Sequence, residues 1–302
     1  MKGTHVDIAP VPLSVGRRSS QVIADYLALT KPRLNSLVVV TSAGGYYLGV
    51  SSPAFLPMAA VAMGTALVAG GAAVLNQVYE RETDALMQRT RLRPLPDQRV
   101  TPEEARTFGT LLAGAGLVFL SVSANALAAL LALVTLVVYL TVYTPMKRRS
   151  PLATLIGAVP GALPPLIGWT AASGSLSLGG WALFAIVFLW QIPHFMAIAW
   201  LYRDDYARAG FPMLPVVEPD GRRAGLQAVF YAAALVPASV APTVVGLTGA
   251  AYFWTALILG VGLLWMAARF ALSRTDATAR LLFYSSITYL PLIWTAMLLD
   301  HF

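Results

Sequence analysis

Long apolar stretches separated by short polar segments make up almost the whole chain. Crossing a bilayer takes roughly 20 mostly apolar residues in a helix. Stretches near that length lie at 34–50, 55–78, 105–123, 125–144, 152–172, 178–200, 226–247, 251–270 and 281–299. Hydrophobic residues make up 57% of the 302 positions and charged residues only 12%, which is too apolar for a soluble domain. The pattern predicts an all-α polytopic membrane protein with about nine transmembrane helices.

The basic residues are distributed on one side of this predicted bundle. All 21 lysines and arginines fall before the first apolar stretch, in every second connecting segment, or within two residues of such a segment. Lys and Arg accumulate in short cytoplasmic loops, so we expect a cytoplasmic N-terminus and an outer C-terminus, in a bacterial inner membrane. The net charge of +7 is then explained by topology and contact with anionic membrane lipid, and does not indicate nucleic-acid binding.

The N-terminal segment differs from the rest of the chain. Residues 1–24 are largely polar, include Pro10 and Pro12, and lack the apolar core of a signal peptide. We expect a disordered cytoplasmic tail over 1–24 and a single transmembrane domain over 25–302. The absence of cysteine excludes disulfides, thiolate chemistry and thioether attachment of haem.

Asn76, Glu80 and Asp84 follow the second apolar stretch at intervals of four residues. On a helix this spacing places them on one face. Oxygen ligands of this kind suit Mg2+, which combines a few carboxylates with water and phosphate oxygens. Arg89 and Arg93 follow closely and would meet phosphate oxygens. The alternative is a polar helix end that merely flanks a membrane span.

A second acidic and basic loop follows the sixth stretch. It contains Asp204, Asp205 and Arg208 and then a proline pair, as the first loop does. The spacing of four spans predicts two pseudo-repeated four-helix bundles around a central cavity, with a ninth helix added; chance resemblance of the loops is the alternative. The segment 157–169, rich in Gly and Pro, favours a cavity, although ordinary helix kinks explain it equally well.

Two further polar positions are candidates. His194 lies inside the sixth stretch, about 9 Å from its cytoplasmic end; an imidazole at membrane depth either contacts haem iron or a substrate, or makes a structural hydrogen bond beside Pro193. Tyr143 and Lys147 share a face if the helix continues past Pro145. The lysine would then hold a diphosphate oxygen, unless it is only a topological anchor.

Several of these segments together resemble one family over residues 25–300. The segments are 76–84, 89–95, 143–148, 157–169 and 190–214, and they are similar to the protoheme IX farnesyltransferase family of UbiA-type intramembrane prenyltransferases. Glu80 stands where the superfamily pattern has Asp, and Ala209 stands where a spaced second aspartate is expected. Which of Asp204 and Asp205 touches metal is therefore open.

The resemblance implies a Mg2+-dependent enzyme that converts farnesyl diphosphate and haem B into haem O and diphosphate, with haem B as a substrate rather than a fixed cofactor. A downstream haem-modifying enzyme or terminal oxidase assembly proteins would be partners. An aromatic polyprenyltransferase and a secondary transporter are the rival interpretations. The resemblance assigns metal binding and catalysis to Asn76, Glu80, Asp84, Asp204 and Asp205, and substrate binding to Arg89, Arg93, Tyr143, Lys147, His194, Arg203 and Arg208.

Overall fold

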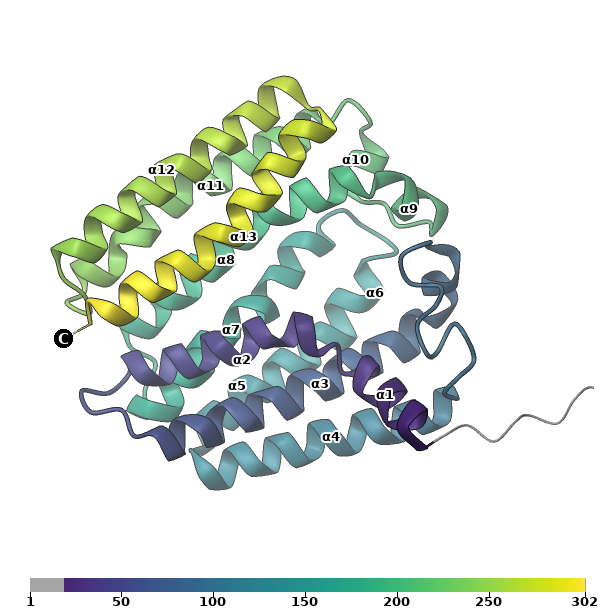
Figure 1. The fold of residues 1–302 in the computed structure, drawn as a ribbon, viewed down its shortest axis with the longest axis horizontal. Helices are drawn as coiled ribbons and strands as arrows, with labels where there is room; N and C mark the ends of the chain where they lie inside the picture. The colour runs from purple at the N-terminus through teal and green to yellow at the C-terminus, as the bar shows by residue number, and fades with distance from the viewer. Residues whose placement is uncertain (1–18, 302) are drawn as a thin grey trace, which may run out of the picture.

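The computed structural model describes residues 19–301, which form long helices lying alongside one another (Figure 1). The longer helices are α2 (Pro32–Leu48), α3 (Phe55–Leu86), α4 (Pro102–Ser123), α5 (Ala126–Val137), α7 (Ala153–Ser173), α8 (Leu178–Leu201), α11 (Arg222–Val244), α12 (Ala250–Ser273) and α13 (Asp276–Leu299). Shorter elements are α1 (Ser19–Leu29), a π segment η1 (Val138–Tyr143), α6 (Thr144–Met146), α9 (Arg203–Arg208) and α10 (Leu214–Val217).

Each predicted span has a helical counterpart, so the all-α prediction is confirmed. Within the described residues, 8 helices are long and apolar enough to cross a membrane, with Ala126–Met146 counted as one continuous span. The first predicted span corresponds to α2, which has 17 residues and packs against α3 and α7. The chain is therefore an integral membrane protein.

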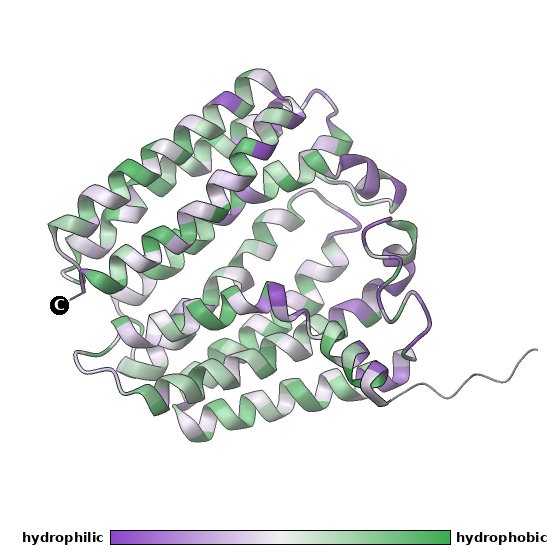
Figure 2. Ribbon diagram, in the orientation of Figure 1, coloured by the Kyte–Doolittle hydropathy of each residue, from purple (hydrophilic) through white to green (hydrophobic). Residues whose placement is uncertain are grey.

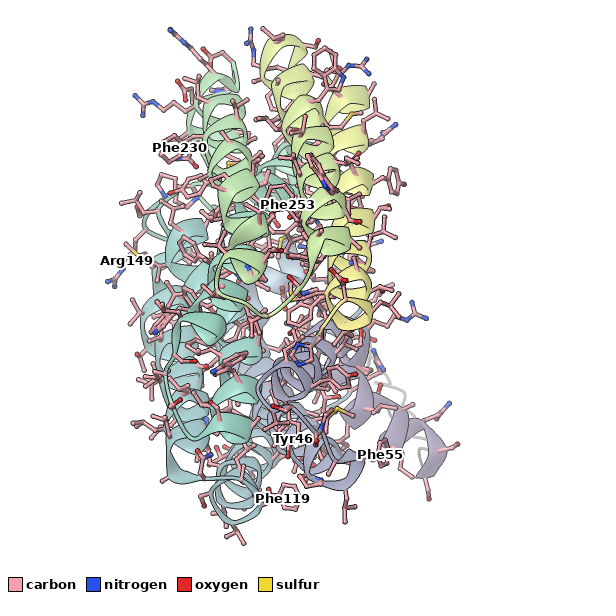
Figure 3. All side chains as sticks on the ribbon, turned by 90° about the vertical axis from the view of Figure 1, so that its left-hand side faces the viewer. Tyr46, Phe55, Phe119, Arg149, Phe230 and Phe253 are labelled. Carbon is pink, nitrogen blue, oxygen red and sulfur yellow. The ribbon has the colours of Figure 1, made fainter. Side chains whose placement is uncertain are left out.

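The side chains on the outer surface fit a lipid environment. Phe55 and Phe230 are 76% and 67% exposed, and both lie at the outside of the bundle in Figure 3. Hydrophilic residues gather instead at the end that carries α9, α10 and the loop after α3 (Figure 2). A soluble protein rarely exposes so much contiguous apolar surface, whereas helices in a bilayer gain nothing from hiding it.

Helix α1 includes residues 19–24, which the sequence analysis assigned to the tail; residues 1–18 lie outside the described part. The helix buries Asp25 and Leu29 and exposes Val22, Ile23 and Leu27. Asp25 forms an ion pair with Arg99 from the loop after α3. This 11-residue amphipathic helix is too short to stand out in a hydropathy profile, and it begins before residue 25.

The helices form two groups joined by α7. Helices α2 to α5 lie on one side of the molecule and α8, α11, α12 and α13 on the other (Figure 1). Helix α7 packs against α2 and α5 in the first group and against α8 in the second. The fifth span thus connects the groups instead of belonging to one of them.

The Gly- and Pro-rich segment of α7 brings two backbones close together. A Cβ added at Gly168 would lie 1.8 Å from the carbonyl oxygen of Ser42, and one at Gly45 would lie 2.1 Å from that of Pro165. Glycine is therefore required at this contact, as at other small-residue interfaces between membrane helices. The expected open space does not occur at this interface.

The loop between α3 and α4 has well-defined ends. Helix α3 runs for 32 residues and stops at Met87, whose backbone is extended. Helix α4 starts with a capping box of Thr101 and Glu104, with Pro102 in its first turn. A capping box satisfies two backbone donors that a helix start leaves unpaired. The loop from 87 to 101 is thus held at both ends, beside the polar end of the molecule.

We expect the polar end to face the cytoplasm. Leu92 lies in the loop after α3 and Ser175 between α7 and α8, at opposite ends of the predicted spans, and both are exposed. In this cysteine-free chain, a Leu92→Cys protein should resist an impermeant thiol reagent in intact cells, whereas a Ser175→Cys protein should react. The reverse labelling pattern would contradict the orientation, and labelling after permeabilisation controls for access.

Candidate active site

The last three turns of α3 carry a buried row of oxygen ligands. Asn76, Glu80 and Asp84 are only 1%, 6% and 1% exposed, so the predicted common face is confirmed and points into the protein. An ionised carboxylate removed from water needs a charged or hydrogen-bonding partner. The partners of these three side chains therefore define the site.

Lys147 is the partner of Glu80. Its Nζ lies 2.7 Å from Glu80 Oε1 and also over the rings of Tyr143 and Phe211, at 5.1 and 5.6 Å from their centroids. Burial opposes the charged form of Lys147, but Tyr143 and Glu80 outweigh it and raise the pKa of the ammonium. The helix continues past Pro145 through η1 and α6, so the predicted common face of Tyr143 and Lys147 is confirmed.

Arg93 is the partner of Asp84. Its Nη1 lies 2.7 Å from Asp84 Oδ2, and the hydroxyl of Thr90 donates to the backbone carbonyl of Asp84 at 2.7 Å. The loop after α3 therefore folds back onto the helix end. This fold-back places a guanidinium from the loop inside the site.

The amide of Asn76 is oriented by Thr144. Thr144 Oγ1 donates its only proton to the carbonyl oxygen of Tyr139 at 2.7 Å and accepts from Asn76 Nδ2 at 3.1 Å. The amide nitrogen is therefore turned away from the site and Oδ1 is turned toward it. The orientation suits an oxygen ligand for a metal cation.

Lys31 was not predicted as a site residue. Its Nζ lies 3.4 Å from Asn76 Oδ1, and its backbone is left-handed (φ 50°) just before α2. Burial lowers the pKa of Lys31 to about 7, and the nearby Arg93 acts in the same direction. In the sequence Lys31 is one of several basic residues before the first span, and no spacing distinguishes it from a topological anchor.

The second acidic loop meets the first. Asp205 is buried and ion-paired with Arg208, and its Oδ1 accepts from the backbone N–H of Gln88 at 3.4 Å. The guanidinium of Arg89 lies 5.5 Å from the ring centroid of Tyr202. The two acidic loops therefore contact each other.

Apolar side chains also join the two loops. Met87 from the first loop packs with Ala209 and Phe211 from the second in one small buried cluster. The two loops thus share a core of their own at the polar end. This core and the hydrogen bond from Gln88 to Asp205 hold the two loops against each other.

Two residues predicted to belong to the site, Asp204 and Arg203, lie apart from the ligands on α3. Asp204 is exposed, whereas its neighbour Asp205 faces the first loop. Arg203 donates to Asp276 at 2.9 Å and to the carbonyl of Trp200 at 2.7 Å, and it stacks over the Trp200 ring. Arg203 therefore lies at the junction of α8 and α13 and not among the ligands on α3.

His194 lies on the other group of helices. Its Nδ1 is 2.8 Å from Ser286 Oγ on α13, and its ring stacks on Trp190 and Phe283. Counted along the helix axes, His194 lies about 10 Å from the end of α8, and Glu80 about 9 Å from the end of α3.

The donor set fits a magnesium ion shared with a phosphate ligand. Asn76 Oδ1 and the carboxylates of Glu80, Asp84 and Asp205 are hard oxygen donors, as Mg2+ requires. Within residues 19–301 no group of three or more His, Cys, Asp and Glu side chains is arranged to hold a metal ion by itself. Mg2+ commonly takes only one or two carboxylates and completes its shell with water and substrate phosphate.

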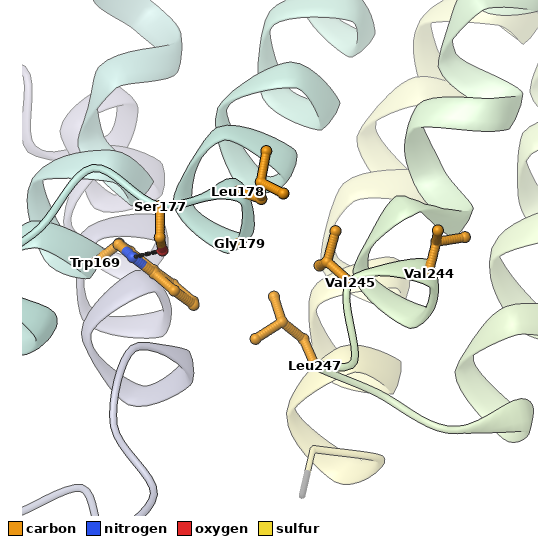
Figure 4. Close-up of a pocket in the computed structure, with 7 residues that line it drawn as sticks. All are labelled: Trp169, Ser177, Leu178, Gly179, Val244, Val245 and Leu247. Atoms are coloured by element: carbon orange, nitrogen blue, oxygen red, sulfur yellow. Dashed lines mark hydrogen bonds between the residues drawn. The ribbon is translucent and has the colours of Figure 1, made fainter.

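A hollow at the opposite end of the molecule has a different character. It has a volume of about 570 Å3 and is lined by residues near the α7–α8 turn and the end of α11 (Figure 4). Trp169 Nε1 donates to Ser177 Oγ at 2.9 Å there, and no lining residue is charged. The residues that line the hollow include no group able to neutralise a phosphate, unlike those at the polar end.

Residues 37–289 match the model of the UbiA prenyltransferase family, and the chain belongs to this family. Solved structures share the fold. A structure of digeranylgeranylglyceryl phosphate synthase has a TM-score of 0.78 at 18% identity, covering 93% of this chain and 98% of that one. A UbiA homologue from Archaeoglobus fulgidus bound to GPP and Mg2+ has a TM-score of 0.65 at 16% identity, covering 90% and 99%.

Among curated proteins the chain is similar to protoheme IX farnesyltransferases. The protein from Solibacter usitatus is 46% identical over 287 residues, covering 92% of this chain and 98% of that protein. The protein from Koribacter versatilis is 43% identical over 303 residues, covering 96% and 97%. The resemblance seen in the sequence motifs thus extends over nearly the full length.

The Glu80–Lys147 pair should couple strongly in a double-mutant cycle. Glu80→Gln or Lys147→Met leaves one buried charge without its partner, while the double variant removes both. We expect a coupling energy of about 1–3 kcal/mol in the free energy of unfolding, measured by denaturation in detergent. The exposed Arg81–Glu82 pair, 3.4 Å apart, is the control and should couple by less than about 1 kcal/mol. If the changes that Glu80→Gln and Lys147→Met cause in the free energy of unfolding were simply additive, the expected coupling between the two side chains would be contradicted.

Proposed function

We propose that the protein transfers a farnesyl group from farnesyl diphosphate to a vinyl group of haem B, with addition of water, and releases haem O and diphosphate. The observation that carries the proposal is the buried row of Asn76, Glu80 and Asp84, each beside a polar or cationic partner. A set of oxygen ligands interleaved with cations suits a metal-bound diphosphate.

Haem B as the acceptor is supported by the relatives. The proteins that are 46% and 43% identical over nearly the whole chain are protoheme IX farnesyltransferases. An aromatic polyprenyltransferase would share the diphosphate site but is not favoured by these names. Membership of a prenyltransferase family also disfavours a secondary transporter.

Asn76 Oδ1, Glu80, Asp84 and Asp205 would hold Mg2+. When bound, the ion supplies positive charge that neutralises the diphosphate leaving group. Lys147 and Arg93 are paired with carboxylates now, and with the diphosphate present they turn to its oxygens. Lys31, Arg89 and Arg208 line the same region and add positive charge. Five basic side chains thus face three carboxylates, and this excess of positive charge attracts the anionic diphosphate.

The reaction breaks the C1–O bond of farnesyl diphosphate, the vinyl π bond of haem and one O–H bond of water, and it forms one carbon–carbon and one carbon–oxygen bond. The electron pair of the C1–O bond leaves with the diphosphate. The π electrons of the haem vinyl group form the new carbon–carbon bond to C1. Water then adds to the cationic carbon beside the porphyrin and loses a proton to solvent water. The rings of Tyr139 and Tyr143, 5.3 Å apart, offer faces that stabilise a developing allylic cation.

We also propose a bacterial inner membrane as the location, with the N-terminus and both acidic loops in the cytoplasm. Farnesyl diphosphate carries its charge on one end and an apolar chain on the other. A site at the cytoplasmic end of the bundle admits the diphosphate from water while the chain extends between helices. Haem O is too apolar to leave freely, so a haem-modifying enzyme or oxidase assembly protein is the expected recipient.

The direct test uses purified protein in detergent with Mg2+, farnesyl diphosphate and haem B. We expect haem O, identified by mass spectrometry, and equimolar diphosphate. A chelator should stop both products. Geranylgeranyl diphosphate is offered as an alternative prenyl donor, in competition with farnesyl diphosphate. A quinone precursor is offered as an alternative acceptor, in competition with haem B. Prenylation of the quinone precursor in place of haem would refute the proposal.

Asp84→Asn should remove activity without unfolding the protein. The variant keeps the shape of the side chain but loses the charge that holds metal and orients Arg93. We expect haem O formation to fall by at least about 10- to 100-fold, measured at saturating Mg2+. Asp97→Asn is the matched control, because Asp97 lies in the same loop with a side chain 45% exposed. Wild-type activity of Asp84→Asn at limiting Mg2+ would contradict a metal role.

A further inference from the structure

The ring of His194 is held in one plane by two aromatic neighbours. It lies between Trp190 and Phe283, with centroid distances of 5.1 and 5.2 Å and interplanar angles of 17° and 20°. Rotation of the imidazole would break both stacks. The direction in which each ring nitrogen points is therefore fixed by packing.

The protonation of the two nitrogens is fixed by Ser286. Ser286 Oγ lies 2.7 Å from the carbonyl oxygen of Phe283 and 2.8 Å from His194 Nδ1. A hydroxyl has one proton to donate, and a carbonyl oxygen can only accept. The hydroxyl proton therefore goes to Phe283, and Nδ1 must donate its own proton to Ser286. A neutral imidazole protonated at Nδ1 carries its lone pair at Nε2.

Nε2 is left open by the protein. No described residue forms a hydrogen bond with His194 Nε2. Among residues 19–301, the buried side-chain polar atoms that lack a partner are Trp294 Nε1 and His301 Nε2, and His194 Nε2 is not one of them. His194 Nε2 therefore has no protein partner, but it is not completely buried. The lone pair is therefore neither used by a protein donor nor completely covered by protein atoms.

We propose that Ser286 is a positioning residue, which holds His194 as the Nδ1–H tautomer and so presents the Nε2 lone pair to the iron of the haem substrate. The inference rests on the proposed function. An imidazole protonated at Nε2 has no lone pair there to give to iron. Hydrogen bonds to the second nitrogen of a ligating histidine commonly set its tautomer and orientation. No electron transfer is involved, only coordination.

The position of His194 suits this role. His194 lies about 10 Å before the end of α8 and Glu80 about 9 Å before the end of α3, and the two helices belong to different groups. Both helices lead into the loops of the polar end, so a macrocycle held through its iron at His194 would lie toward the same end of the molecule as the ligands for the diphosphate. Ligation would position the haem relative to the farnesyl donor as well as bind it.

Ser286 also has a purely structural interpretation, as a link between α8 and α13. A second link exists at the same place, because Trp190 Nε1 donates to the backbone carbonyl of Ser286 at 2.7 Å. This bond does not involve the hydroxyl. Variants that lack only the hydroxyl therefore keep one connection between the helices, and loss of haem ligation can be separated from loss of packing.

The experiment compares Ser286→Thr with Ser286→Val. Ser286 is fully buried. Thr and Val have nearly the same shape, so the two variants differ in having a hydroxyl or a methyl group at one position. Haem B is titrated into each purified full-length protein and followed by its absorption spectrum, with His194→Ala as the reference for lost ligation. Farnesyl diphosphate affinity and thermal stability are measured in parallel.

Two further variants complete the set. Ser286→Ala adds no volume and replaces Ser286→Val if the buried methyl groups prevent folding. Ser121→Ala is the matched control, since Ser121 makes the same kind of bond to a carbonyl three residues back, at 2.8 Å, on an exposed surface. It should leave every measurement unchanged.

We expect Ser286→Thr to keep the wild-type haem spectrum. Ser286→Val and Ser286→Ala should lose haem affinity by about tenfold or more and shift toward the spectrum of His194→Ala, with farnesyl diphosphate affinity unchanged. A wild-type spectrum and affinity in Ser286→Ala would overturn the inference. So would equal losses of haem affinity, diphosphate affinity and stability, which mark a structural role.

The two proposals fail in different ways. Wild-type protein that shows an imidazole-ligated haem but makes no haem O would refute the proposed function and leave the role of Ser286 standing. Wild-type protein that makes haem O while its bound haem has the same spectrum as in His194→Ala would refute only the positioning role.

Discussion

Charge neutrality in a water-poor place is the constraint on which the rest of this structure depends. Three carboxylates, those of Glu80, Asp84 and Asp205, are buried at the polar end of the helices, and each has a cation beside it. Two of the three pairs tie one segment to another, whereas Asp205 and Arg208 both lie in α9. Glu80 and Lys147 join α3 to α6, and Asp84 and Arg93 close the loop after α3. The ion pairs thus act as structural ties in the free protein and as exchangeable ligands when a diphosphate arrives.

Much of this arrangement follows from periodicity in the sequence. Nine apolar stretches separated by one-sided basic segments predict the helices, and intervals of four residues predict the shared face of Asn76, Glu80 and Asp84. Both features are local, because they depend on helix geometry within one segment. The approach of the two acidic loops was also predictable, since they follow spans that end on the same side.

Features that depend on contacts between distant segments were not predictable. Thr144 orients Asn76 across 68 residues, and Lys31 approaches it across 45; neither has a sequence pattern that distinguishes it. Arg203 and Arg208 belong to one short helix but face different neighbours, Asp276 and Asp205, because the register of α9 decides which side each takes. The Gly and Pro residues of α7 gave an ambiguous signal, since close packing and open space both use them.

The π segment η1 changes the direction in which the side chains that follow it point. Thr144 follows Ala128 by sixteen positions, which in an unbroken α-helix amounts to about 160° beyond four full turns. The two side chains would then point to nearly opposite sides, yet both are 0% exposed. A π turn contains about one residue more than an α-helical turn. The side chains that follow it are therefore rotated back by about 100° about the helix axis, relative to an unbroken α-helix. One additional residue within the membrane thus turns Thr144 and Lys147 from the lipid side to the interior, and a deletion of one residue in η1 would return them to lipid.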